Sequence, residues 1–66
     1  MDQQTAIQIL DQIVCAIEEA GYDARAQLTG YLQEGDPTFI TRRNGAREQI
    51  MQLDKALIRS YLNRLP

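Results

Sequence analysis

The spacing of apolar positions predicts that the first third of the chain forms one amphipathic helix, over residues 5–20. Apolar side chains fill one half of its helical wheel, and glutamines, carboxylates and Cys15 fill the other half. Because the apolar arc is wide, we expect this helix to face more than one neighbour. Gly21 then ends the helix, since glycine accepts the left-handed conformation found at many helix ends.

A second apolar pattern predicts a helix over residues 24–34, with Asp23 as its N-cap. Gly30 interrupts this helix at a modest cost in helix propensity, and we expect another backbone to approach closely there. The apolar stripe of the helix consists of Ala24, Leu28, Tyr31 and Leu32.

Turn signals dominate the next segment, residues 35–45. Asp36 followed by Pro37 suits an N-cap and the first position of a short helical turn. Residues 38–41 are β-prone but too few to form a sheet by themselves, and an Asn-Gly pair marks a further turn. We therefore expect a Gly/Pro-rich central loop.

The last part of the chain, residues 46–65, contains neither glycine nor proline and keeps helical spacing. One straight helix would place Arg47 and Asp54 inside its apolar arc, where lone charges are costly. Either Asp54 caps a separate last helix, or both charges point into an interface and are paired there. We favour a break near residues 53–54.

These elements predict an all-α fold, a compact small bundle of three to five helices in a single domain over residues 1–66. A 66-residue chain is expected to bury only about 60% of its unfolded surface, so we also expect a homodimer. No apolar run approaches the roughly 18 residues of a membrane span, so no membrane insertion is expected. The N-terminus lacks the basic region of a signal peptide, and the single cysteine suits a reducing compartment, so we expect a cytoplasmic protein.

Charge is unevenly distributed along the chain, whose net charge is −2. Residues 1–36 hold seven acidic residues and one basic residue, and residues 37–66 hold six basic and two acidic residues. The two parts can therefore attract each other, within one chain or between two chains. The alternative is that they form solvated faces of opposite sign.

The residue types that ordinary catalysis requires are scarce. Histidine is absent from the sequence, which removes the commonest general base and metal ligand. A single cysteine builds no zinc site, and no phosphate-binding glycine loop or EF-hand loop is present. We therefore expect no enzyme activity, cofactor or metal.

Three arginines, Arg42, Arg43 and Arg47, follow Phe39 closely and raise nucleic-acid binding as an alternative function. The isoelectric point of about 4.8 argues against it, because phosphate contacts dominate nucleic-acid affinity. The more ordinary interpretation is that the arginines pair with carboxylates of the chain or of a partner. Within the chain, the candidate carboxylates are Asp23, Glu34 and Asp36.

Residues 21–47 read GYDARAQLTGYLQEGDPTFITRRNGAR, and this string resembles the IreB family of small bacterial proteins. Phe39 stands for the family's aromatic residue, and the closing Tyr-Leu at positions 61 and 62 also matches. Departures are an Asp-Ala pair at positions 23 and 24 in place of Asn-Pro, and the arginine pair and glycine of residues 42–45. The matching positions are Gly21, Tyr22, Gln27, Gly30, Tyr31, Leu32, Gly35, Asp36, Pro37, Ile40, Ala46, Arg47 and Ile50.

The resemblance implies an all-helical homodimer with a regulatory, non-catalytic role, linked to a Ser/Thr kinase that responds to cell-wall stress. It also implies phosphoacceptor threonines in a longer N-terminal segment than this chain shows. Thr5 is our phosphoacceptor candidate, because a phosphate near a helix N-terminus is favourable. A plain N-cap is the alternative role for Thr5.

We expect the central loop to be the recognition or dimer surface. Aromatic and apolar side chains would anchor a partner, and arginines would form a polar rim. The alternative is that the aromatic side chains complete a thin core. The expected surface residues are Tyr22, Tyr31, Asp36, Pro37, Phe39, Ile40, Arg42, Arg43 and Arg47.

Overall fold

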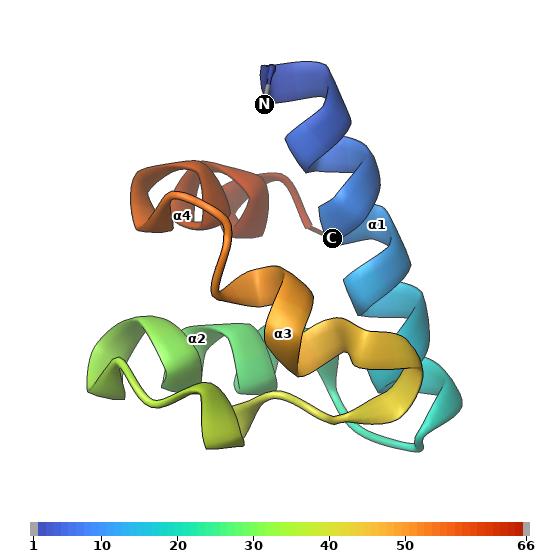
Figure 1. Ribbon diagram of the computed structural model, residues 1–66. Helices are drawn as coiled ribbons and strands as arrows, with labels where there is room; N and C mark the ends of the chain where they lie inside the picture. The colour runs from blue at the N-terminus through green and yellow to red at the C-terminus, as the bar shows by residue number, and fades with distance from the viewer. Residues whose placement is uncertain (1, 66) are drawn as a thin grey trace.

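The computed structural model describes residues 2–65, which form four α-helices and two short 3-10 helices (Figure 1). The predicted all-α fold is confirmed, and the number of helices lies within the predicted range. The β-prone residues 38–41 form no strand, because Asp36 and Pro37 begin a 3-10 turn there. In chain order the elements are α1 (Gln3–Glu19), α2 (Ala24–Glu34), η1 (Pro37–Phe39), η2 (Arg43–Gly45), α3 (Ala46–Ile50) and α4 (Lys55–Arg64).

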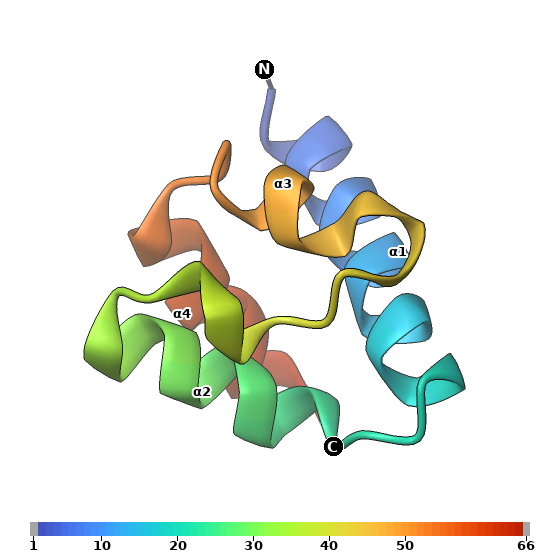
Figure 2. The same cartoon turned by 60° about the horizontal axis from the view of Figure 1, so that its bottom comes forward.

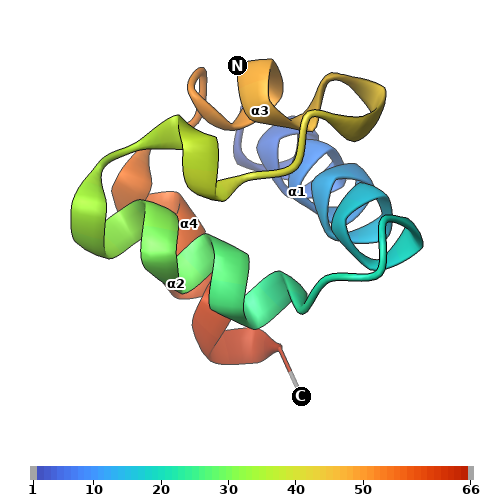
Figure 3. The same cartoon turned by 90° about the horizontal axis from the view of Figure 1, so that it is seen from below.

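The helices pack in two groups around α1. Short α3 lies across α1, while α2 and α4 lie side by side (Figures 1 and 2). After α2 the chain reverses, and residues 35–42 run back along α2 toward the C-terminal end of α1 (Figure 3). This returning segment connects the two groups.

Helix α1 begins earlier than predicted, at Gln3, because Asp2 rather than Thr5 is its N-cap. An Asp2 carboxylate oxygen accepts the backbone N–H of Thr5 at 2.8 Å. Thr5 is therefore a first-turn residue, and the expectation of a Thr5 cap was wrong. Gly21 has the predicted left-handed conformation, with φ of +88°. Cys15 is exposed, as its place on the polar face predicted.

Helix α2 has the predicted bounds, and Asp23 caps it by accepting the N–H of Arg25 at 3.0 Å. The expected close approach at Gly30 is present, but its source is a side chain rather than a backbone. A Cβ added at Gly30 would lie 2.8 Å from Cδ1 of Phe39. An alanine at this position would therefore have to displace the Phe39 ring that packs on the helix.

The favoured break near residues 53–54 is confirmed. Asp54 is extended, with φ of −67° and ψ of 131°, and its carboxylate accepts the N–H of Ala56 at 2.8 Å. The break lets Leu53 and Ile58 both turn into the core although one straight helix would not align them. Asp54 caps α4, and its side chain is exposed, so its charge is not buried.

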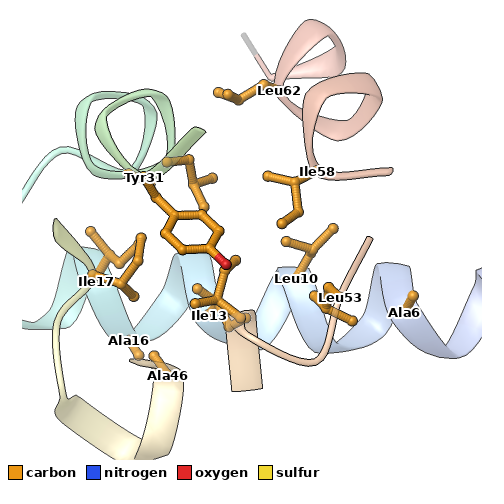
Figure 4. Packing of buried hydrophobic residues seen from close by; sticks show 14 residues of the cluster. Ala6, Leu10, Ile13, Ala16, Ile17, Tyr31, Ala46, Leu53, Ile58 and Leu62 are labelled. Atoms are coloured by element: carbon orange, nitrogen blue, oxygen red, sulfur yellow. The ribbon is translucent and has the colours of Figure 1, made fainter. Parts of the chain in front are cut away.

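The core is wholly apolar within residues 2–65, where no charged or polar residue is buried. Figure 4 shows the Tyr31 ring reaching from α2 toward Ile13 of α1, and Leu10 facing Ile58 of α4. Small side chains let α1 and α3 approach. The buried residues are Ala6, Leu10, Ile13, Ala16, Ile17, Ala24, Leu28, Tyr31, Ile40, Ala46, Ile50, Leu53, Ile58 and Leu62.

In the part of the chain that the structure describes, no helix combines the length and the hydrophobicity needed to cross a membrane.

Candidate functional site

A groove with a volume of about 430 Å³ lies along the returning segment where it passes α2 and α3. We call it the central groove. Its walls come from three separate parts of the chain, the turn before α2, helix α2 itself and residues 38–47. The lining residues are Tyr22, Gln27, Thr38, Phe39, Ile40, Thr41, Arg42, Arg43 and Arg47.

Side-chain hydrogen bonds hold the backbone of the groove from two sides. From α2, Gln27 Oε1 accepts the N–H of Thr41 at 3.0 Å. From α3, Arg47 donates Nε–H to the carbonyl of Ile40 at 2.9 Å and a second N–H to the carbonyl of Thr38 at 3.4 Å. Side chains of α2 and α3 thus bond to the backbone of this irregular segment. They hold it in place although it has no strand partner.

Asp36 fixes the beginning of the same segment. Its carboxylate accepts the N–H of Thr38 at 2.9 Å and caps η1, with Pro37 in the first turn as predicted. The hydrogen bonds from the Thr38 N–H and hydroxyl hold the pKa of Asp36 below its ordinary value of 3.8, and the charge of Arg47 adds to this. Asp36 and Pro37 therefore shape the groove, although neither lines it.

The arginines of the groove differ in their partners. Arg43 contacts Glu19 at the end of α1, with 3.5 Å between Nε and Oε1 and more than half of each side chain exposed. Arg47 binds backbone carbonyls. The exposed Arg42 side chain makes no hydrogen bond or ion pair with any described residue.

The prediction that these arginines pair with Asp23, Glu34 or Asp36 was therefore wrong, since the ion pair observed is with Glu19. Arg43 contacts Glu19 because the η2 turn lies over the C-terminal end of α1.

The aromatic residues separate into two kinds. Tyr22 is 58% exposed and Phe39 is 43% exposed, and both border the central groove. Tyr31 and Ile40 are buried in the core, so the expectation that they anchor a partner at the surface was wrong. Tyr31 lies on the buried stripe of α2, and Ile40 packs into the core directly after the η1 turn, where the backbone becomes extended.

The structure brings together six of the nine expected surface residues, and leaves Tyr31, Asp36 and Pro37 outside the groove lining. Sequence reasoning missed three lining residues, Gln27, Thr38 and Thr41. Gln27 lies among the positions that match the family pattern, which was the available signal for it. Thr38 and Thr41 carried no signal, because their place depends on how the segment folds back.

The phosphoacceptor candidate lies at the other end of α1 from the groove. Thr5 is exposed and lies fourteen positions before Glu19 in the same helix, about 21 Å along the axis. The Thr5 hydroxyl and N–H both bond to Asp2 and hold the pKa of that carboxyl below its ordinary value. Thr5 and the groove are thus separate features.

Among residues 2–65, no three His, Cys, Asp or Glu side chains gather as a metal ion would require.

The fold and the groove define a small all-helical module with a surface groove lined by aromatic, threonine and arginine side chains. Residues 1–63 of the chain match the family model described as IreB regulatory phosphoprotein. The chain therefore belongs to the IreB family, and its role is regulatory. This confirms the resemblance of the central segment and extends it over nearly the whole chain.

Proposed function

We propose that this chain is a non-catalytic regulatory module that acts by binding other proteins through the central groove. The observation that carries the proposal is the combination, on one fixed backbone segment, of two exposed aromatic rings and an arginine without a partner in the described chain. Aromatic residues and arginine dominate the energetics of protein interfaces. The family's regulatory description supports the same conclusion.

Affinity capture from the native host tests this function. The tagged chain should retain a partner that Phe39→Ala loses, because the ring is one of the two exposed aromatic groups of the groove. Arg59→Gln is the control, because Arg59 is an exposed residue of α4 that does not line the groove. This variant should capture the partner as the wild type does. Equal capture by all three proteins, with each shown to be folded, would contradict the proposal.

The nucleic-acid alternative has lost much of its motivation. Of the three arginines that raised it, Arg47 binds backbone carbonyls and Arg43 contacts Glu19. A dedicated nucleic-acid surface would need several guanidinium groups free to reach phosphates. Binding of duplex DNA at low salt would restore this alternative.

The proposal extends to control by a Ser/Thr kinase in cell-wall stress, inside the cytoplasm, with Thr5 as the acceptor. Support comes from the family description as a phosphoprotein and from the exposure of Thr5 in the first turn of α1, where a phosphate is favourable. Phosphosite mapping of the chain isolated from stressed cells tests it. Phosphate at Thr5 supports this control, and a fully unmodified Thr5 overturns it.

A homodimer is the remaining part of the proposal. Several apolar side chains are only partly buried against the core, among them Ile9, Val14 and Leu57, and a second copy would cover them. Sedimentation at micromolar concentration should give twice the mass of one chain. A clean monomer would remove the dimer.

A further inference from the structure

We propose that the central groove binds an extended acidic segment of a partner protein. A ligand carboxylate would lie against Arg42 and Arg43, and a neighbouring apolar side chain would pack on Phe39 and Tyr22. Glu19 would compete with the ligand for Arg43. This inference rests on the proposed function and names the chemistry of the partner.

The charge of the groove carries the first step. Three guanidinium groups line it and no carboxylate does, although the whole chain has a net charge of −2. The Arg42 side chain has no hydrogen bond or ion pair within residues 2–65. A local cationic site on an anionic molecule favours a short acidic segment, whereas a long polyanion would also meet the acidic remainder of the surface.

The groove offers apolar contact beside these charges. Phe39 packs on Gly30 and is still 43% exposed, and Tyr22 across the groove is 58% exposed. The volume of about 430 Å³ falls within the range of ordinary ligand sites, so it suits a few side chains rather than a folded domain. A partner residue of leucine or phenylalanine type would therefore complete the contact.

The hydrogen-bonding state of the segment indicates how the ligand is recognised. The N–H groups of Thr38 and Thr41 and the carbonyls of Thr38 and Ile40 already bond to side chains of this chain. The segment is thus not a free edge to which a strand could be added. Recognition must then come from side chains, with guanidinium and aromatic groups as the main contacts.

The Glu19–Arg43 contact is the regulatory element of this site. One oxygen meets one nitrogen at 3.5 Å, with both side chains more than half exposed, so the contact is weak. A ligand carboxylate that engages a guanidinium with both oxygens makes a stronger, better-oriented pair. Glu19 therefore lowers affinity without closing the groove.

An array of octapeptides tests the ligand class directly. Each set carries one central leucine or phenylalanine, flanked by glutamate, glutamine or lysine. The folded wild-type chain should retain the glutamate set above the other two. Preference for the glutamine or lysine set, or no retention of any peptide, would overturn the acidic-segment proposal.

Fluorescence anisotropy with the best glutamate octapeptide then tests the residues. Arg42→Gln should weaken binding about fivefold, and Glu19→Gln should strengthen it about twofold. Glu34→Gln makes the same change in net charge as Glu19→Gln at an exposed site outside the groove lining, and should leave affinity unchanged. Equal gains from the two glutamate variants would overturn the competition by Glu19.

Two further outcomes would overturn the inference. Tighter binding of a mixed-sequence DNA duplex than of the glutamate octapeptide, at 150 mM salt, would assign the groove to nucleic acid. If the peptide shifted amide signals only at residues that do not line the groove, the groove would be covered or unused. If the peptide fails while Phe39→Ala still loses a captured partner, the proposed function stands and only the acidic chemistry is wrong.

Discussion

Gly30 and Phe39 determine each other's position. A Cβ on residue 30 would lie 2.8 Å from the Phe39 ring, so the position of this ring at the groove depends on the missing side chain in α2. Helix propensity alone would favour alanine at this position by about 1 kcal/mol. The glycine is therefore explained by the packing of the ring, since it costs α2 intrinsic stability.

A double-mutant cycle tests this dependence. Gly30→Ala in the wild-type chain should not stabilise the fold, because the gain in propensity is offset by displacement of the Phe39 ring. In a Phe39→Ala background the same change should raise the free energy of unfolding by about 1 kcal/mol. Chemical denaturation of the four proteins measures both effects, and identical effects in the two backgrounds would contradict the account.

Tyr61 and Asp11 join α4 to α1 by a hydrogen bond of 2.6 Å from the phenol to a carboxylate oxygen. Partial burial and this bond raise the pKa of Tyr61 above its ordinary value of 10.0. Because the folded pKa is the higher one, the stabilising contribution is complete below pH 10 and is lost as pH rises further.

We therefore expect Tyr61→Phe to lower the free energy of unfolding at pH 7 by about 1 kcal/mol. The difference between wild type and variant should shrink above pH 10. Urea denaturation at pH 7 and pH 11 measures it. An unchanged stability at pH 7 would show that the hydrogen bond contributes nothing.

At the scale of elements, caps decide where the helices of this short chain begin. Asp2, Asp23, Asp36 and Asp54 each precede a helix and accept a backbone N–H of its first turn. The cap at Asp54 matters most for topology, because it separates α3 from α4 and lets both bury their apolar faces.

Replacing Asp54 with alanine should lower the free energy of unfolding by about 1 kcal/mol, while Asp54→Asn should cost much less. The alanine removes the acceptor for the N–H of Ala56, whereas asparagine keeps one. Thermal unfolding followed by circular dichroism compares the variants. Equal losses for alanine and asparagine would point to the charge rather than the cap.

Acid should weaken the caps at Asp2 and Asp36. The pKa of each carboxyl is lowered in the folded chain, chiefly by hydrogen bonds from Thr5 and from Thr38. Their stabilisation is therefore present above the ordinary value of 3.8 and is lost as pH falls through the lower folded value. We expect the double variant Asp2→Asn/Asp36→Asn to lose less thermal stability below pH 4 than the wild type does. Thermal unfolding measured from pH 7 to pH 2 compares the two proteins. If the melting temperatures of both proteins fell in parallel with pH, these caps would not contribute to acid sensitivity.

The elements with strong local signals were predictable. The bounds of α2 and the break at Asp54 followed from caps and apolar spacing. The start of α1 was missed because a carboxylate at Asp2 caps as well as a threonine does. The partners of the arginines were not predictable, since they depend on residues 35–42 folding back along α2, and no local pattern encodes that path (Figure 3).

For the whole molecule, the uneven charge of the chain reaches the groove through three of the six basic residues in residues 37–66. The acidic first part and the basic second part meet in the contact between Glu19 and Arg43, the ion pair observed among the described residues. That contact is weak and exposed, so charge attraction does little to hold the fold. Packing of apolar side chains holds the fold, and this leaves Arg42 and the weakly held Arg43 available to bind a partner.

The most direct test of protein binding through the central groove is photo-crosslinking in the native host. A benzophenone amino acid would replace Phe39 in one strain and Arg59 of α4 in another. The account predicts that position 39 crosslinks to a different protein and that position 59 does not. Crosslinks from position 59 alone, or from position 39 only to a second copy of this chain, would contradict it.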